Sequence, residues 1–425
     1  MSSRAAQLSA RVRARLARAA QDGALHTALQ LIDMAASSVL WLALLPVTLA
    51  LHLAGLRRLT VLVGRIGHLA AEPDSFLKAR ALGMVAPRRY FVLARRGAVA
   101  NGALLEYWRP FLAVIEQPLA CWVLHAMSRW ALMKHDMSRY VLQLDASQEM
   151  YRINAAWTGR PPLLALSAVD RAWSDERFAE LGLPPGAWFV CVHVREAGFS
   201  PVDEAAHAHR NAGPRAVRPA MEEIVRRGGW CLRMGDPSMT RLEPMPGFID
   251  YAHHPLRSAR LDVLLCARAR FFLGNTSGLA LVSSAFGVPS ALANVIPLTA
   301  LPPLPADLSI PKLLRSARDG RVLGFAEVLG SPALDFRYAR LYADAGIEAI
   351  ENTAEEIRAL VIEMLDRIEG RHVPAPEDGD LQRRFMALLR PGHYGYGAAS
   401  RLGAAFLRHY AHLLPPSVST GNAPR

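Results

Sequence analysis

Two stretches of the sequence carry the residue types that hold a phosphate group. "CVHVRE" places His193 and Arg195 at alternate positions, and "FFLGNTSGLA" places Thr276 and Ser277 shortly after a glycine. The planar guanidinium of arginine meets two phosphate oxygens at once, and the free N–H groups and hydroxyls at a helix start hold an anion. We therefore expect a diphosphate site. The alternatives are an ion pair that holds the loop at Arg195, and ordinary helix capping, which needs only one hydroxyl.

A third stretch, "GRIGHL" at 64–69, carries groups that could contact the same ligand or move a proton. Its two glycines allow a close approach of the backbone, while Arg65 and His68 offer a cation and a general base. Glu72 follows one helical turn after His68 and is a second candidate base. The alternative interpretation is an ordinary turn between a strand and a helix.

A fourth stretch, "RMGDP", contributes Asp236. Its carboxylate could accept a hydrogen bond from a ribose hydroxyl or a nucleobase. An Asp-Pro pair also forms turns readily, so a purely local role is the alternative.

All four stretches follow short apolar runs that alternate with helical patterns, which is typical of α/β folds with parallel sheets. We expect strands at 59–63, 88–94, 188–195, 230–234, 247–251, 270–274 and 288–294, and helices at 69–82, 101–108, 218–229, 258–269, 276–287 and 351–368. Ligands of open α/β sheets bind beyond the carboxyl ends of the strands. The four stretches lie at such strand ends, so they are the expected site.

A Pro/Gly-rich break, "LGLPPGAW" at 181–188, separates the two halves of this pattern. The fold class that we expect is α/β, with two Rossmann-like domains that face a cleft. The expected boundaries are 1–56 for an N-terminal segment, 57–184 and 185–370 for the two domains, and 371–425 for a helical extension.

The N-terminal segment is predicted to associate with a membrane. Five arginines and no acid lie between residues 4 and 18, as in a basic amphipathic helix. The uncharged run at 34–56 is long enough to cross a bilayer. Pro46 interrupts it and basic residues flank both ends, which favours a re-entrant hairpin or an interfacial helix with both ends in the cytoplasm. A single crossing and a buried core helix are the alternatives; a cleaved signal peptide is disfavoured because the stretch before the run is too long.

The composition narrows the partners and the compartment. The chain has 425 residues with 49 Lys+Arg against 37 Asp+Glu, a formal charge of +12. This surplus fits lipid headgroups or phosphorylated small molecules. No basic run is interleaved with aromatic residues, so nucleic acid is not an expected partner. Cys191, Cys231 and Cys266 lie in apolar runs, which predicts reduced, buried thiols and a reducing compartment.

Two other chemistries are weaker. "HAHRN" has His207 and His209 two residues apart, but no third ligand is evident, so no metal is expected. "GNTSG" is similar to a nucleophile elbow with Thr276 in the serine position, which leaves a hydrolase as a minor alternative.

In their order along the chain, these motifs resemble a bacterial glycosyltransferase family of the GT-B fold. The resemblance rests on "RIGHLA", "CVHVRE", "HRN", "RMGDP", "LCARARFFLGNTSGL" and "IENTAEEI", and it spans about residue 60 to the C-terminus. A more distant similarity is to GDP-fucose-dependent fucosyltransferases, which have a "GRFGN"-like turn, an "HxR" strand end and a small-hydroxyl pair. Here His68 replaces the Asn and Glu196 follows Arg195, so neither GDP nor fucose follows.

The resemblance implies metal-independent transfer of a sugar from a nucleotide-diphosphate donor, with no other cofactor. The first domain would bind the acceptor and the second the donor. Arg195 would stabilise the departing diphosphate, and His68 or Glu72 would take the acceptor proton if configuration inverts. The residues expected to bind the donor are Arg65, Gly67, His193, Arg210, Asn211, Asp236, Gly274, Asn275, Thr276 and Ser277.

The expected partners are a nucleotide sugar, a glycan or lipid-linked acceptor, and a membrane. The expected location is the cytoplasmic side of the inner membrane. A membrane-attached protein that binds sugar nucleotides without turnover is the alternative from a different functional class.

Overall fold

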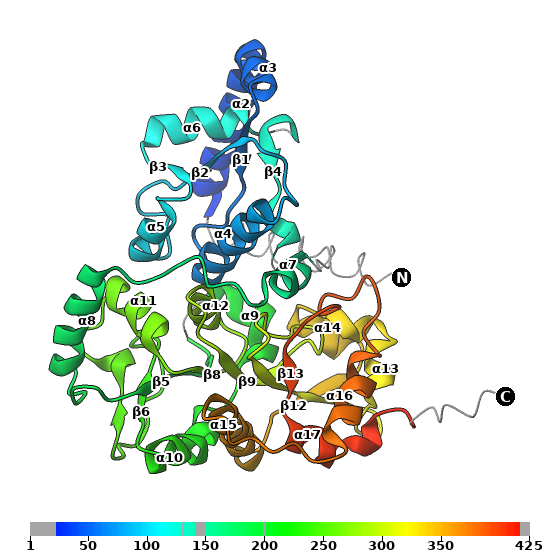
Figure 1. Cartoon of the computed structure of the whole chain (residues 1–425). Coiled ribbons are helices and arrows are strands. Elements are labelled where there is room, and N and C mark those ends of the chain that lie inside the picture. The colour runs from blue at the N-terminus through cyan, green and yellow to red at the C-terminus, as the bar shows by residue number, and fades with distance from the viewer. Residues whose placement is uncertain (1–22, 130, 141–148, 199–200, 417–425) are drawn as a thin grey trace, which may run out of the picture.

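The computed structural model describes residues 23–129, 131–140, 149–198 and 201–416, which form two α/β lobes with a helical arm on the first lobe (Figure 1). The first lobe holds a four-stranded sheet and the second a seven-stranded sheet, and all strand pairs within both are parallel. The expected α/β class with two parallel sheets is confirmed.

The sheet of the first lobe has the order β3-β2-β1-β4. Its strands are β1 Leu56–Leu59, β2 Arg89–Leu93, β3 Ala113–Ile115 and β4 Lys134–His135. Its helices are α4 Ile66–Ala81, α5 Gly102–Trp108 and α6 Pro118–Met127, with α7 Glu149–Trp157 packed on α4. The alternation of strand and helix is what makes these pairs parallel, because each helix carries the chain back to the start of the next strand.

The first strand was expected at 59–63, and this prediction is wrong. β1 ends at Leu59, and the chain leaves the sheet at Thr60. Val63 N–H donates to the Val61 carbonyl at 3.0 Å, a tight turn that no strand contains. The apolar side chain of Val61 is nevertheless buried. A buried loop thus produces the same apolar run that a strand would.

Helix α4 begins at Ile66 rather than at residue 69, so Gly67 and His68 lie in its first turn. Pro73 lies inside this helix and cannot donate to the Leu69 carbonyl. The indole Nε1–H of Trp108 supplies that missing bond, at 2.9 Å. The helix therefore continues through the proline without an unsatisfied buried carbonyl.

The sheet of the second lobe has the order β13-β10-β9-β8-β5-β6-β7. Its strands are β5 Phe189–His193, β6 Trp230–Arg233, β7 Phe248–Ile249, β8 Phe272–Gly274, β9 Ser290–Val295, β10 Leu308–Pro311 and β13 Arg401–Leu402. The strands that follow β5 in sequence lie first on one side of it and then, from β8, on the other. The strand order therefore reverses between β5 and β8, and such a switch point is where open α/β sheets bind ligands.

The helices of the second lobe begin at, or within three residues of, the starts that the sequence predicts. They are α10 Arg218–Arg226, α11 Ala259–Arg268, α12 Gly278–Ala285 and α15 Ala354–Ile368. The Ser258 hydroxyl caps α11 by accepting from Leu261 N–H at 3.2 Å, as expected. Thr353 and Glu356 form a reciprocal capping box at α15.

Two segments outside the expected second domain pack against it. α8 Ala168–Glu180 lies beside α11, where Asp170 pairs with Arg260 at 2.7 Å (Figure 1). At the other end, β13 joins the sheet beside β10 between α16 Asp378–Met386 and α17 Ala404–His409. The C-terminal extension therefore contributes an edge strand as well as helices. The remaining elements are α9 Pro201–His207, α13 Phe325–Leu329, α14 Ala339–Asp344, β11 Leu313–Ser316, β12 Ile347–Ile350 and short 3-10 turns.

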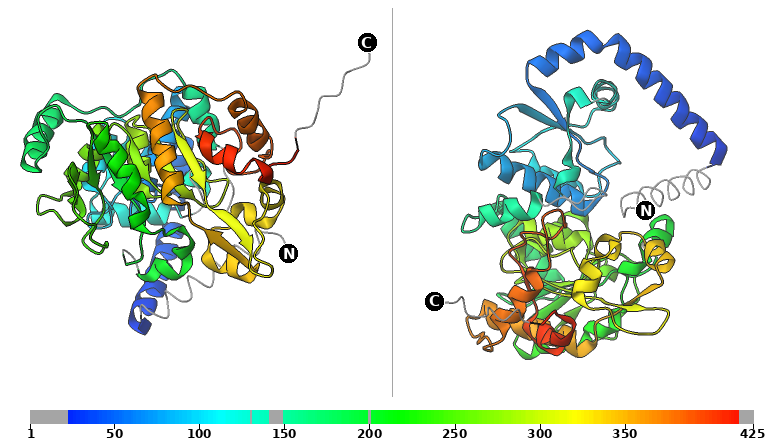
Figure 2. Two further views of the ribbon diagram at one scale, coloured as in Figure 1. Left: turned by 90° about the horizontal axis from the view of Figure 1, so that it is seen from below. Right: turned by 90° about the vertical axis from the view of Figure 1, so that its right-hand side faces the viewer.

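The helical arm consists of α2 Gly23–Ala43 and α3 Leu45–Leu53, and it projects from the first lobe (Figure 2). Within the described part of the chain, no single helix is long and apolar enough to cross a membrane. The segments Ile32–Ala43 and Leu45–Leu53 are together long and apolar enough to cross, but a bend of 66° separates them. A membrane-spanning helix is thus not confirmed, and the basic stretch at 4–18 lies outside the described residues. All four cysteines are free and buried.

Candidate active site

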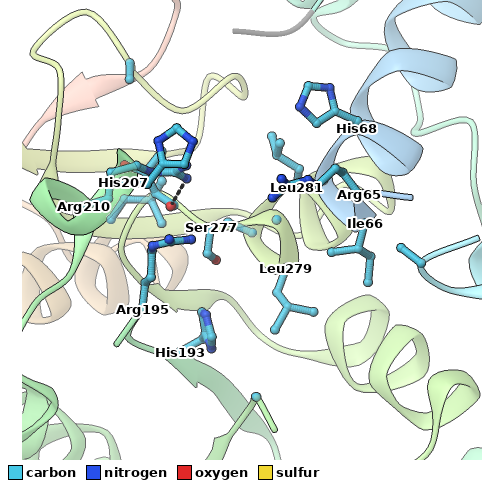
Figure 3. A pocket seen from close by; sticks show the side chains of 18 of the residues that line it. Arg65, Ile66, His68, His193, Arg195, His207, Arg210, Ser277, Leu279 and Leu281 are labelled. Atoms are coloured by element: carbon cyan, nitrogen blue, oxygen red, sulfur yellow. Dashed lines mark hydrogen bonds between the residues drawn. The ribbon is translucent and has the colours of Figure 1, made fainter. Parts of the chain in front are cut away.

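A cavity of about 1520 Å³ lies between the two lobes. Its walls come from the start of α4 in the first lobe and from the loops after β5, β6, β8 and β9 in the second. Arg65 and His68 approach it from one side, and Arg195 and Arg210 from the other (Figure 3). The residues predicted from the sequence that line this cavity are Arg65, Gly67, His68, His193, Arg195, Arg210, Asp236, Thr276 and Ser277.

The first turns of α4 and α12 cross at the edge of this cavity. A Cβ built on Gly67 would lie 2.8 Å from the Cα of Gly278, and a Cβ on Gly278 would lie 2.9 Å from the Gly67 nitrogen. Glycine at both positions therefore lets the two lobes meet backbone to backbone. Both helices direct their amino-terminal ends, which carry partial positive charge, toward the cavity.

His68 and Glu72 form a hydrogen-bonded pair in α4. His68 Nδ1 lies 2.8 Å from Glu72 Oε1, and Glu72 Oε2 accepts from Leu62 N–H at 2.9 Å. Glu72 is fully buried and does not line the cavity, whereas 23% of the His68 side chain is exposed. Burial raises the pKa of the Glu72 carboxyl, and the hydrogen bond from His68 opposes that rise. With Nδ1 directed at Glu72, the imidazole has Nε2 left for a group in the cavity.

Arg195 follows β5 by two residues and is held from two directions. Its Nε donates to Asn211 Oδ1 at 3.1 Å, and Asn211 donates in turn to Glu204 Oε1 at 2.5 Å. Its backbone N–H donates to Asn275 Oδ1 at 3.0 Å. Asn211 therefore orients the guanidinium from beneath the cavity and does not line it.

Asn275 joins the two loops that meet at the switch point. It is 1% exposed, accepts from the Arg195 N–H, and donates to the Arg210 carbonyl at 3.0 Å. Arg210 then donates to the Thr276 carbonyl at 2.6 Å. Gly274, one residue earlier, approaches β5 so closely that a Cβ would lie 2.2 Å from the His193 carbonyl oxygen. Neither Asn275 nor Gly274 lines the cavity; both build its floor.

Thr276 and Ser277 bring two hydroxyls to the start of α12. Ser277 is the N-cap residue, yet its side chain makes no capping hydrogen bond. Among the described residues, neither Thr276 Oγ1 nor Ser277 Oγ has a hydrogen-bond partner, although both atoms are buried. Plain capping does not account for them, because a cap would use at least one. Buried hydroxyls normally have partners, so this pair at a helix start suits a bound anion.

Three other titratable groups flank this anion site: a buried histidine ring and two carboxylates that have partners of their own. His193 Nδ1 lies 3.1 Å from the Met234 carbonyl oxygen. Burial lowers the pKa of His193, which favours the neutral ring. Glu196 is paired with the buried Arg233 and accepts from Thr240 N–H at 3.1 Å. Asp236 accepts from Ser238 N–H at 2.9 Å, the local turn that its Asp-Pro sequence allows. Arg195 and Arg210 therefore supply cationic charge beside the two hydroxyls, and Arg257 and Arg337 also line the cavity.

Aromatic and imidazole rings line a further part of the cavity. His207 stacks on Tyr338 with ring centroids 5.6 Å apart. Burial lowers the pKa of His209 to about 2, so this ring is neutral. Among the described residues, no group of three His, Cys, Asp or Glu side chains is placed to hold a metal ion.

Comparisons with known proteins give distant likenesses only. No family's sequence profile matches the chain, and no curated protein matches it. The solved structures with detectable similarity include an iron-containing dodecameric glycosyltransferase from enterotoxigenic E. coli, with 14% identity, a TM-score of 0.39, and 74% of this chain and 76% of that chain covered. The ADP-heptose LPS heptosyltransferase II of E. coli has 12% identity and a TM-score of 0.36, with 59% and 87% covered.

A family 9 glycosyl transferase from Veillonella parvula is similar at 12% identity and a TM-score of 0.22, with 51% of this chain covered. The present chain spans 60% of the length of that protein. All three are glycosyltransferases, but at these TM-scores the likeness supports no conclusion about the function of the present chain. The chain's own strands form two parallel sheets on either side of a cavity, an arrangement that fits the expected GT-B fold.

Several cavity residues were not predicted from the sequence. Asn101 lines the cavity, caps α5 and donates to the Ala259 carbonyl of the second lobe at 2.8 Å. It follows the carboxyl end of β2, so the strand-end rule applied to the first lobe would have found it. Arg337, Tyr338 and Tyr394 come from segments far along the chain with no strand-end signal.

Proposed function

We propose that the protein is a glycosyltransferase that moves a sugar from a nucleotide-diphosphate donor to a glycan or lipid-linked acceptor. The observation that carries this proposal is that an anion-binding group of residues and a candidate general base lie on opposite walls of the same cavity. One wall has, at the start of α12 beside Arg195 and Arg210, two hydroxyls with no hydrogen-bond partner among the described residues. The other wall has an imidazole whose second nitrogen is held by a buried carboxylate.

The donor diphosphate would bind at the start of α12. Thr276 and Ser277 hydroxyls would donate to its oxygens, the first N–H groups of α12 would point at it, and Arg195 would meet it with a guanidinium already oriented by Asn211. These groups are placed before the reaction, so they stabilise the charge that grows on the leaving diphosphate without rearranging. This supports transfer without a metal ion, because charge neutralisation is available from the chain.

His68 would act as the general base. As the acceptor oxygen forms its bond to the anomeric carbon, its proton passes to His68 Nε2, the anomeric carbon–oxygen bond breaks, and the electron pair leaves on the diphosphate. Glu72 would hold the imidazole in the tautomer that has Nε2 free and would stabilise the imidazolium. Attack by a base-assisted acceptor on the face opposite the leaving group inverts the configuration, so an inverting reaction is the one that this pair supports.

The helical arm supports an acceptor at a membrane. α2 and α3 expose large apolar side chains, including Ile32, Val39 and Leu53, on the lobe proposed to bind the acceptor. We place the protein at the cytoplasmic face of the inner membrane, where a lipid-linked or envelope glycan acceptor would be within reach. Transfer by the full chain to a lipid-linked acceptor should fall when residues 1–53, through the end of α3, are removed, while transfer to a soluble acceptor analogue persists.

A sugar-nucleotide-binding protein without turnover is the second candidate, since the anion site alone would serve it. The His68–Glu72 pair favours an enzyme, because binding needs no oriented base. A hydrolase with Thr276 as nucleophile is disfavoured: Thr276 Oγ1 has no hydrogen-bond partner among the described residues, whereas a nucleophile needs a base in contact.

The test is a panel of nucleotide sugars mixed with the full chain, with binding measured first and sugar transfer or slow donor hydrolysis second. We expect one donor class to bind and turn over, and His68→Gln to keep binding but lose turnover. Binding without turnover under every acceptor condition would favour the second candidate. Absence of binding to any nucleotide sugar would reject both.

A further inference from the structure

A second cavity, of about 490 Å³, lies in the first lobe away from the cleft. Its lining includes Leu56, Arg89 and Ala113, which are the first residues of β1, β2 and β3. In a parallel sheet the amino ends of the strands share one edge, and the active-site loop follows the carboxyl end of β1. This cavity is therefore at the edge of the sheet opposite the candidate active site.

Three arginines line this cavity without an anionic partner in the described part of the chain. Arg80, Arg88 and Arg89 line it, all three are exposed, and none forms an ion pair with any residue that the structure describes. The Arg80 guanidinium lies 5.9 Å from the centre of the Tyr90 ring. Arg57 is close by, with its guanidinium bonded to the His52 and Leu56 carbonyls at 2.9 and 2.8 Å. Four like charges held together without an acid repel one another, and a bound anion would relieve that repulsion.

The whole first lobe shares this imbalance. Residues 57–140 contain 13 Lys+Arg against 5 Asp+Glu, compared with 49 against 37 in the full chain. Of the five acids, Glu106 and Glu116 pair with Arg109, Asp74 with Lys78, and Glu72 with His68. The arginines of the second cavity therefore lie in a lobe whose remaining charge is positive.

Apolar helices adjoin the same end of the lobe. α3 leads through two residues into β1, and its Val47, Leu49 and Leu53 are exposed. α6, which supplies Leu124 to the cavity, exposes Leu119 by 63% and Trp122 by 38%. α2 packs on α6, where Trp122 Nε1 donates to Asp33 at 2.9 Å. α3 lies at the end of the molecule farthest from the second lobe, with α6 below it, whereas α2 runs from that end back toward the second lobe (Figures 1 and 2).

We propose that the second cavity binds the phosphate headgroup of an anionic phospholipid while α3 and α6 lie in the interface of the same leaflet. The arginines meet the phosphodiester oxygens, and Phe91, Ile115 and Leu124 offer an apolar lining for the glycerol and the upper acyl chain. The basic cavity would match the anionic headgroups of a leaflet, and the exposed apolar helices beside it would match the upper part of the acyl chains. The inference rests on the proposed membrane association and not on sugar transfer.

The test is flotation of the full chain with vesicles of phosphatidylcholine alone and with vesicles that also contain phosphatidylglycerol, whose anionic headgroups give the surface a negative potential. The variant Arg80→Gln/Arg88→Gln/Arg89→Gln removes the cavity cations. The matched control is Arg215→Gln/Arg241→Gln/Arg318→Gln, which removes the same charge from exposed positions of the second lobe that form no ion pair with the described residues. We expect the cavity variant to lose at least a tenfold preference for anionic vesicles, since each basic residue at such a surface contributes roughly a fivefold effect, and the control to keep it.

Equal losses in both variants would mean diffuse attraction by net charge and would overturn the site. No loss in either would mean that the apolar helices alone hold the membrane, which would overturn it as well. If the triple variant unfolds at a lower temperature than the control, Arg88→Gln/Arg89→Gln replaces it, because neither side chain forms a hydrogen bond or an ion pair with the described residues. Nucleoside-diphosphate binding should be unchanged in all of these variants, so failure of this inference is distinguishable from failure of the proposed function.

Discussion

Gly67 of α4 and Gly278 of α12 pack backbone to backbone, with a Cβ on either one less than 3 Å from main-chain atoms of the other. This contact joins the two lobes at the edge of the cavity. It also fixes the distance between the His68 side chain, one residue along α4, and the Ser277 hydroxyl, one residue before Gly278. Geometry at the proposed reaction centre therefore depends on two residues that have no side chain.

Gly278→Ala should reduce transfer by moving the two helix starts apart. The added methyl meets Ile66 Cγ2 at 2.8 Å and the Gly67 backbone, so the lobes must shift, with an overpacking penalty of about 1–3 kcal/mol. Gly102→Ala is the matched control, because Gly102 also opens a helix but has no atom within 4 Å of its Cβ position. Thermal unfolding and transfer rates should fall in the first variant only; equal behaviour of the two would show that the contact does not matter.

His68→Gln should lower the transfer rate by a factor of about 10²–10⁴ while leaving donor affinity unchanged, because a general base acts only in the transition state. The measurement pairs calorimetric donor binding with turnover. A parallel loss of affinity and rate would instead place His68 in donor binding.

Glu72→Gln tests the positioning role of the buried carboxylate. An amide there can present N–H to His68 Nδ1 and stabilise the wrong tautomer, so we expect a loss of rate by a factor of roughly 10–100 with little change in donor affinity. If Glu72→Gln is as slow as His68→Gln and the double variant is no slower, the two residues act as one unit. Independent, multiplicative losses would contradict the pairing.

The rate should fall as the solution is acidified. Burial raises the pKa of Glu72, so this carboxylate takes a proton at a higher pH than an exposed glutamate. Once protonated, it no longer stabilises a positive imidazolium, and the base loses its support. A profile of kcat/KM between about pH 5 and pH 9 should show this acidic limb in the native chain, and Glu72→Gln should alter it. An unchanged profile in that variant would contradict the role of Glu72.

Asn275→Ala should weaken nucleotide binding by about tenfold without a change in any residue that lines the cavity. The buried amide bridges Arg195 N–H and the Arg210 carbonyl, and its loss leaves both groups unsatisfied, at about 1–3 kcal/mol each. Asn275→Asp keeps the acceptor for Arg195 and should recover part of the affinity. No difference between the two variants would argue against the bridge as the cause.

Trp108→Phe should lower the free energy of unfolding by about 1 kcal/mol, because the Leu69 carbonyl opposite Pro73 loses its donor. In a Pro73→Ala background the backbone N–H of residue 73 can take over, so the same change should be nearly neutral there. A double-mutant cycle by denaturant unfolding measures the difference. Equal penalties in both backgrounds would contradict the compensation.

The strands of the second lobe could be predicted because they are buried on both faces. "FVCVH" and "FFLG" read as continuous apolar runs bounded by turn residues, and the structure has β5 and β8 there. The strand-end rule then placed Arg195, Thr276 and Ser277 at one edge, and all three line the cavity.

The first strand of the first lobe was harder to predict, because a buried loop produces the same apolar run in the sequence as a buried strand. Residues 61–63 are a loop whose Leu62 N–H is bonded to Glu72, a contact between residues ten positions apart that no periodicity reveals. The true strand β1 contains Arg57 and Arg58, whose charges hid it. Similarly, three residues from the predicted motifs lie beneath the cavity and do not line it: Asn211, Gly274 and Asn275. Neighbours in sequence point to different sides of a loop, so a shared motif does not place them all in the cavity.

The central claim is that Arg195 and the Thr276–Ser277 pair hold the diphosphate of the donor. The most direct measurement is calorimetric binding of the tightest of ADP, GDP, UDP and CDP to the native chain, to Arg195→Ala, and to Thr276→Ala/Ser277→Ala, with Arg215→Ala as the control. Each site variant should lose a factor of about 10–100 in affinity, the value of charge-assisted hydrogen bonds to a phosphate, and the control should lose nothing. Native affinity in both site variants would contradict the assignment.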